Sequence, residues 1–263
     1  MKQILLFLFT LAINLIGQAQ KPEPVYSFAK VSKPVAWYKT QATAWQKEFE
    51  KNPKNAAAWY FHYRALRNLI YIDTNDRRSR EEKNKDLTKL IARMEKAVPN
   101  SYEFNLTKWM NGGNNFKYLP YLKKAMELGE GHTEYLCDVL VWAEGERDLE
   151  RRNTFARKWF ESGDVSPGLL YYNYNVLIGL PKNAIVFTGG DNDTFPAWVL
   201  QAQGVRPDVL VLNSYLLHLT DYRKRIFDEI EVDNLDLYED EDHNLEKEKL
   251  EKFEVKLILN VAA

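Results

Sequence analysis

IVFTGGDNDTFP, from Ile185 to Pro196, is the stretch where the pattern of the sequence changes from helical spacing to a β-branched apolar run. Two glycines end this run, and two carboxylates, Asp191 and Asp193, follow at once. The next segment, TFPAWVLQAQ, has helical character, and a second apolar run then ends at Asn213. With the helical YLLHLTDYRKRIFDEI after it, the order strand, helix, strand, helix predicts a parallel strand pair with a right-handed crossover.

Upstream of this stretch, apolar residues recur at helical spacing from residue 35 to about residue 180. Openings such as NPKNAAAWYFHYRAL, VPNSYEFNLTKWM and SPGLLYYNYNVLIG recur along this region, much like the starts of tetratricopeptide units. Single helix pairs cannot bury their apolar faces without stacked neighbours, so we expect an irregular helical-repeat array. The expected fold class is therefore mainly α with a small α/β module.

The start of the chain has the pattern of a secretory signal peptide. Lys2 precedes an apolar segment from Ile4 to Ile16, and the small residues Gly17 and Ala19 follow. The apolar segment is shorter than a bilayer requires, which favours cleavage over anchoring. The expected organisation in chain order is a signal peptide 1–20, a Pro-containing lead 21–34, a helical-repeat region 35–180, and an α/β module 181–263 with an acidic C-terminal stretch.

Composition limits the expected cellular location and the expected classes of binding partner. The 36 basic and 37 acidic residues give a formal charge of -1, so no overall field attracts nucleic acid or an anionic membrane. The single cysteine, Cys137, excludes a disulfide within the chain, which fits a bacterial periplasm better than an extracellular animal fluid. No later segment is long and apolar enough to be a transmembrane anchor after signal cleavage. We therefore expect an exported protein, periplasmic or associated with the cell envelope of a Gram-negative bacterium.

The carboxyl ends of the two predicted strands are the candidate site, because ligands of open parallel sheets bind there. Asp191 and Asp193 offer oxygen ligands to a hard divalent cation, and the preceding glycines allow close approach of the backbone. A helix beginning near Thr194 would direct its N-terminal amides at the same crevice, which favours an anion such as phosphate. The candidate ligand-binding residues are Gly189, Gly190, Asp191, Asn192, Asp193, Thr194, Asn213 and His218.

Helix capping explains the same residues without a ligand. Asp193 or Thr194 suits the N-cap position, Pro196 is tolerated in a first helical turn, and Asp191 can close an Asx-turn over the glycines. The sequence contains no nucleophile elbow, phosphate loop, Cys/His dyad or His pair at metal-ligand spacing. The choice between a binding site and a helix cap stays open on the sequence alone.

The stretch from Tyr171 to Leu217 resembles the soluble C-terminal region of bacterial membrane proteins similar to protein O-mannosyltransferases, a family of unknown function. The matching positions are Gly190, Asp191, Asn192, Asp193 and Thr194, followed by Arg206, Asp208, Val209 and Asn213. The many membrane-spanning helices of that family are absent here, so transferase activity is not implied. The resemblance implies an envelope-facing soluble module with an Asp-Asn-Asp turn.

Two functional hypotheses follow, and the sequence leaves open whether the chain is an enzyme. The first is a non-enzymatic exported scaffold or binding module, with no cofactor, for a protein or glycan partner in the envelope. The second is a divalent-cation-dependent enzyme or ligand-binding module, which acts on a phosphate- or sugar-bearing envelope substrate through Asp191 and Asp193.

Overall fold

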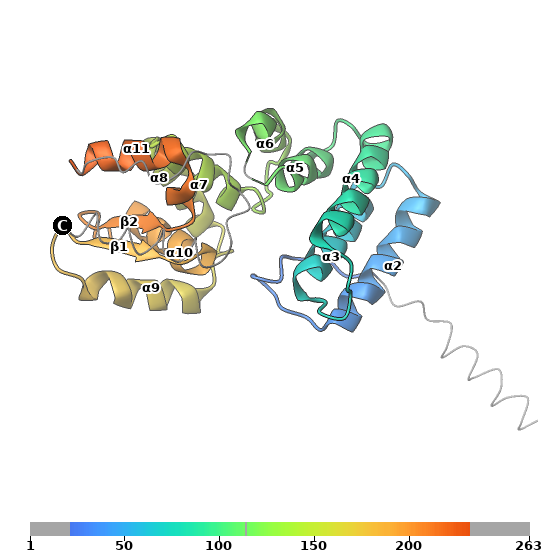
Figure 1. The fold of residues 1–263 in the computed structure, drawn as a ribbon, viewed down its shortest axis with the longest axis horizontal. Helices are drawn as coiled ribbons and strands as arrows, with labels where there is room; N and C mark the ends of the chain where they lie inside the picture. Colours follow the sequence, from blue (N-terminus) through green and yellow to red (C-terminus); the bar gives the residue numbers. More distant parts are fainter. Residues whose placement is uncertain (1–21, 114, 232–263) are drawn as a thin grey trace, which may run out of the picture. The chain divides into compact units, whose positions relative to one another are not determined.

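The structure is a computed structural model that describes residues 22–113 and 115–231, and it confirms a mainly α fold with a small α/β module (Figure 1). The chain divides into two compact units between Glu130 and Gly131. The predicted boundary at residue 181 falls within the second unit. The predicted signal peptide and most of the acidic C-terminal stretch lie outside the described residues.

The first unit is built from helices. They are α2 (Val35–Lys51), α3 (Ala56–Ile72), α4 (Arg80–Ala97), α5 (Tyr102–Asn111), the 3-10 helix η1 (Phe116–Tyr118) and α6 (Leu119–Leu128). α2 packs extensively against α3, and α5 packs against α6. The tetratricopeptide-like character of the array stays a prediction.

Local capping signals decide where these helices begin. The Asn55 side chain accepts a hydrogen bond from the backbone N–H of Ala58, so α3 starts after Asn55 rather than at the preceding Pro53. Ser79 and Glu82 form a reciprocal capping box at the start of α4. The charged segment between α3 and α4 therefore ends in a well-defined helix start.

The second unit contains three helices before the sheet and a helix after each strand. Its elements are α7 (Leu136–Gly145), α8 (Leu149–Glu161), α9 (Pro167–Gly179), β1 (Ile185–Thr188), α10 (Asp191–Ala202), β2 (Leu210–Asn213), the 3-10 helix η2 (Leu216–His218) and α11 (Thr220–Glu229). None of the helices in the described ranges combines the length and apolar character needed to cross a bilayer.

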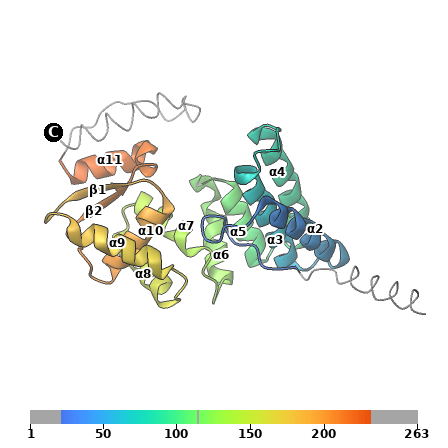
Figure 2. The same cartoon turned by 90° about the horizontal axis from the view of Figure 1, so that it is seen from below.

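The parallel strand pair is confirmed, with Ile185 paired to Leu210 and Thr188 to Asn213. Figures 1 and 2 show α9 and α11 on opposite sides of this pair, and α10 packs against both α8 and α9. β2 is more completely buried than β1, since Ile185 at the start of β1 is 36% exposed. The register places the ends of both strands, Thr188 and Asn213, side by side.

Candidate functional site

The structure resolves the alternative helix caps at the end of β1. Gly190 is the N-cap of α10, with φ 142° and ψ -171°, and the helix begins at Asp191. The expectations that Asp193 or Thr194 is the N-cap and that the helix starts near Thr194 are therefore wrong. No side chain caps this helix end, and Asp191 and Asp193 instead occupy its first turn, where negative charge interacts favourably with the helix dipole.

Pro196 lies inside α10 rather than in its first turn, which corrects a second expectation. A proline has no N–H, so the carbonyl four residues earlier, that of Asn192, loses its usual helical donor. The side chain of Asn173 in α9 replaces that donor, because its Nδ2 lies 3.1 Å from the Asn192 carbonyl oxygen. The helix start is thus completed by a side chain from the neighbouring helix.

A chain of buried hydrogen bonds joins the two strand ends to α10. Asn213 Nδ2 donates to Thr194 Oγ1 at 2.9 Å, and Thr194 Oγ1 lies 2.6 Å from Thr188 Oγ1. Thr188 Oγ1 donates in turn to the carbonyl oxygen of Leu212 at 3.1 Å, so the Thr194 hydroxyl is the donor in the middle bond. The hydroxyl groups of Thr188 and Thr194 are therefore both used in holding the sheet to the helix.

Asn213 and Ser214 also shape the turn that follows β2. The side-chain oxygen of Asn213 accepts hydrogen bonds from the backbone N–H groups of Tyr215 and Leu216, at 2.9 and 3.2 Å. Ser214 Oγ donates to the carbonyl oxygen of Thr188 at 2.7 Å. Of the predicted ligand-binding residues, Asn213 and Thr194 are therefore buried structural groups, and His218 lies partly buried at the end of η2.

Asp191, Asn192 and Asp193 are exposed at this edge of the sheet, next to Gly189. Protein atoms packed around the Asp191 carboxyl disfavour its charged form and raise its pKa, although the residue as a whole keeps solvent access. Residues two apart in a helix do not face each other, so Asp191 and Asp193 are not a preformed pair. Within residues 22–113 and 115–231, no three His, Cys, Asp or Glu side chains are grouped to hold a metal ion.

Tyr215 is a site residue that the sequence analysis missed. It is 63% exposed, and a Cβ added at Gly190 would lie 4.0 Å from its ring. Its position follows from the turn held by Asn213, and no local sequence signal indicates where such a ring points. An exposed aromatic ring, two glycines and two carboxylates therefore share this edge of the sheet.

α9 presents a second unpredicted feature, an exposed face that carries no charge. Its 13 residues, PGLLYYNYNVLIG, contain no Asp, Glu, Lys or Arg. Tyr171, Tyr174 and Ile178 recur at helical spacing and are exposed, as is the adjacent Tyr172; Tyr171 is 72% exposed. These four side chains are called the α9 face below.

Arg206 and Asp208, from the segment that resembles the envelope proteins, have a structural role. The Arg206 guanidinium binds Asp208 through Nε and Nη2, at 2.9 and 2.8 Å, and this holds the pKa of Asp208 well below its usual range. Asp208 also accepts from the backbone N–H of Asn183. The guanidinium further donates to the carbonyl oxygens of Leu177, Leu180 and Pro181. The pair therefore fixes the end of α9 and the connection to β1.

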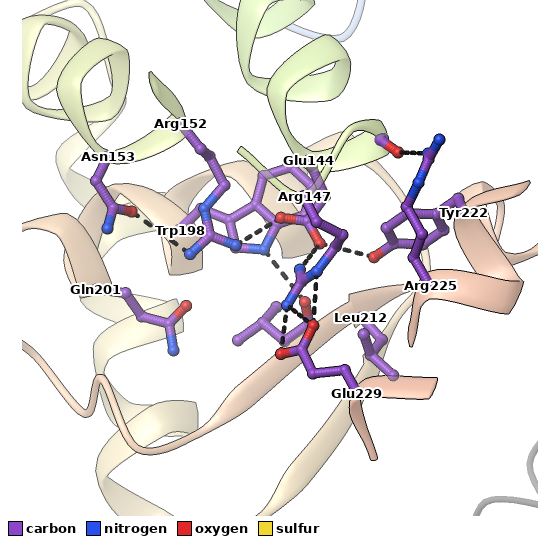
Figure 3. A network of polar contacts seen from close by, with 12 residues as sticks. Glu144, Arg147, Arg152, Asn153, Trp198, Gln201, Leu212, Tyr222, Arg225 and Glu229 are labelled. Carbon is purple, nitrogen blue, oxygen red and sulfur yellow. Dashed lines mark hydrogen bonds and ion pairs between the residues drawn. The ribbon is translucent and has the colours of Figure 1, made fainter. Parts of the chain in front are cut away.

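A buried ionic network lies in the same unit (Figure 3). The Glu144 carboxylate on α7 is fully buried and accepts hydrogen bonds from Arg147, from Arg152 Nη1 at 2.6 Å, and from the hydroxyl of Tyr222 at 2.7 Å. Arg147 extends the network to Glu229 at the end of α11. Burial and the neighbouring Glu144 raise the pKa of Tyr222 well above its usual value.

The buried part of this network connects several helices. Arg152 lies 5.4 Å from the ring centre of Trp198 in α10, and the indole Nε1 donates to the carbonyl oxygen of Val211 in β2. Arg225 on α11 donates to the carbonyl oxygen of Gly145 at the end of α7. We infer that its role is to hold α7, α8, α10 and α11 together, and not to bind a ligand.

The fold and the strand-end geometry define a small module in which a parallel strand pair lies between helices and presents polar residues at its carboxyl edge. A family model described as TMEM260-associated domain 2 matches residues 171–231, less than half of the chain. The match extends from α9 to the end of α11 and so includes the strand ends and the α9 face. No curated protein and no solved structure matches the chain significantly.

Proposed function

We propose that the chain is an exported, non-enzymatic binding module of the bacterial cell envelope, with a protein or glycan as its partner. The observation that carries this proposal is the α9 face, where three tyrosines and an isoleucine are exposed on a helix without charged residues. Tyrosine combines a large apolar ring with a polar hydroxyl, and it is enriched where proteins contact their partners.

The placement of this face supports a binding role. It lies within residues 171–231, the part matched by the TMEM260-associated domain 2 model. The resemblance of this part to the soluble region of O-mannosyltransferase-like envelope proteins favours a partner in the envelope. The N-terminal sequence pattern supports export. The hydroxyl groups at the strand ends are occupied in structural hydrogen bonds, which favours binding over catalysis at that edge.

Replacing the α9 tyrosines tests the proposal. We expect the variant Tyr171→Ser/Tyr172→Ser/Tyr174→Ser to lose at least about tenfold in partner affinity, because exposed aromatic anchors carry much of the energy of such interfaces. Purified wild-type and variant chains would be compared on immobilised envelope glycans and by crosslinked capture from envelope extracts. The bound fraction is measured in both formats.

Phe160→Ser is the matched control, because Phe160 on α8 is also an exposed ring, at 41%, but lies outside the α9 face. It should leave binding unchanged. Equal binding by the wild type and the triple variant would contradict the role of α9. Capture of nothing above background by the wild type in either format would contradict the proposed function itself.

The cation-dependent alternative makes a different prediction for thermal unfolding. A cation that binds only the folded state raises the unfolding midpoint. On our proposal, calcium, magnesium, manganese and zinc should shift the midpoint of the wild type no more than that of Asp191→Asn/Asp193→Asn. A shift seen in the wild type and lost in the double variant would instead favour the cation site, where a bound cation would offset the desolvation that raises the pKa of Asp191.

A further inference from the structure

The two outer edges of the strand pair differ in whether their backbone groups are already hydrogen-bonded. We propose that β1 is a docking strand, which binds an extended peptide segment of a partner protein along its outer edge. This edge consists of other residues than the α9 face. The inference therefore goes beyond the proposed function, and it holds whether or not the α9 face binds a partner.

The hydrogen bonds between the strands show which backbone groups of β1 point outwards. The carbonyl oxygens of Ala184 and Thr188 accept from backbone N–H groups at the start of β2 and just after its end, at 2.9 and 3.0 Å. Alternate residues of a strand direct their backbone groups to the same neighbour. The groups of Val186 and Thr188 therefore face β2, whereas those of Ile185 and Phe187 face away from it.

The outward edge of β1 is open. Within residues 22–113 and 115–231, the backbone groups of Ile185 and Phe187 have no hydrogen-bond partner on this side. Ile185 is 36% exposed and Val186 and Phe187 are only partly buried, so the strand keeps contact with solvent. The strand IVFT also contains no charged residue and no proline, which are features that commonly protect an edge strand from pairing.

The outward edge of β2 is closed by side chains of α10. Trp198 Nε1 donates to the carbonyl oxygen of Val211 at 3.2 Å, and Gln201 Nε2 donates to that of Val209 at 2.6 Å. These carbonyl groups lie at the alternate positions that face away from β1. A further strand at this edge would have to displace both side chains. The fold thus protects one edge of the pair and leaves the other available.

The unpaired groups of β1 determine the chemistry of the partner. Ile185 and Phe187 each offer an N–H donor and a carbonyl acceptor, about 6.6 Å apart along the strand because each strand residue rises about 3.3 Å. An extended peptide offers acceptors and donors at the same spacing, as in recognition by strand addition. A helical partner uses its backbone groups internally and offers no such set. Apolar β-branched side chains suit this partner, because they would pack beside the exposed Ile185.

The experiment is residue-resolved amide hydrogen exchange of the full chain, alone and with the peptide acetyl-Lys-Lys-Val-Ile-Val-Ile-Lys-Lys-amide. At saturating peptide, we expect the amides of Ile185 and Phe187 to exchange at least about tenfold more slowly, because a hydrogen-bonded amide exchanges only when its bond opens. Val186 and Thr188 are internal controls, since their N–H groups face β2 and should be protected in both states. No added protection at Ile185 and Phe187 would overturn the proposal.

The chain alone is measured at several concentrations, because two other occupants of the edge are distinguishable in this way. Strong protection of Ile185 and Phe187 at every concentration would mean that the chain covers its own edge. Protection that increases with concentration would mean that a second copy pairs there. Either result would overturn binding of a partner peptide, whereas rapid exchange at all concentrations supports it.

A backbone-modified peptide tests whether main-chain hydrogen bonds carry the binding. The analogue with N-methyl groups on its four central residues keeps the side chains and the lysine charges but has no N–H donors in this part. We expect it to bind at least about tenfold more weakly than the parent peptide in titration calorimetry, because it loses several hydrogen bonds. Equal affinities would mean that side chains or charge explain binding, and would overturn the proposal.

Ile185→Pro tests the same edge from the side of the protein. Proline is tolerated on an edge strand where the missing N–H would face solvent, so the fold should persist while peptide affinity falls at least about tenfold. Ile185→Val keeps the N–H and should bind like the wild type. Val186→Pro removes an inward N–H and should unfold at a clearly lower temperature than Ile185→Pro. Equal unfolding midpoints for the two proline variants would contradict the outward direction of the Ile185 N–H.

Discussion

Glu144→Ala is expected to lower the free energy of unfolding by about 3–5 kcal/mol, because removing one partner of a buried ion pair leaves the other charge buried without compensation. Glu144 is fully buried, and Arg152 is nearly so. The variant would leave the Arg152 guanidinium without its carboxylate, and the Tyr222 hydroxyl without its acceptor. Urea-induced unfolding monitored by tryptophan fluorescence measures the effect, since Trp198 lies against this network.

Glu229→Ala is the control for this prediction. Its carboxylate binds the same Arg147, but the Glu229 side chain is 45% exposed. Ion pairs with this solvent access contribute about 0–1 kcal/mol, so the control should lose at most that amount. Similar losses for Glu144→Ala and Glu229→Ala would show that burial is not what makes the network important.

Gly190→Ala is expected to lower the free energy of unfolding by about 1–3 kcal/mol, since its backbone conformation is open in practice to glycine alone. With φ 142° and ψ -171°, Gly190 allows the chain to turn from β1 directly into α10. An alanine would either hold this strained conformation or displace the helix start, including Asp191. Urea-induced unfolding followed by far-ultraviolet circular dichroism gives the loss of stability.

Gly189→Ala is the control for Gly190→Ala, because it adds the same methyl group at the neighbouring position without backbone strain. The backbone of Gly189 lies outside the left-handed region, and a Cβ added there meets only Asp193 Oδ2, at 3.7 Å. This is an ordinary van der Waals contact, so we expect a change within about 0.5 kcal/mol, as for most surface substitutions. If Gly189→Ala destabilises the protein as much as Gly190→Ala, the conformation of Gly190 is not the cause.

The sequence alone was sufficient for the type and order of the elements around the strand pair. The apolar runs ending at Thr188 and Asn213 are strands, and TFPAWVLQAQ is largely helical, because these patterns depend on local periodicity. The same information could not decide the helix cap. Gly190, Asp193 and Thr194 all belong to residue types found at N-caps, and the choice depends on how α10 packs against the strands.

The candidate site could be predicted only in part, for a related reason. Its glycines and carboxylates are consecutive in sequence, so a local motif reveals them. The position of the Tyr215 ring near Gly190 brings two separate turns together, and the hydrogen bond from Tyr222 to Glu144 spans 78 positions. Long-range contacts of this kind leave no periodic signal in a single sequence.

The link between Asn173 and Pro196 has a consequence for protein engineering. The side chain of Asn173 supplies the donor that the ring of Pro196 withholds from the carbonyl of Asn192. The two positions therefore form a single transferable unit, although they belong to different helices. A designer who grafts the Gly-Asp-Asn-Asp-Thr turn onto another scaffold must transplant α9 with it, or replace Pro196 so that α10 can complete its own backbone hydrogen bonds.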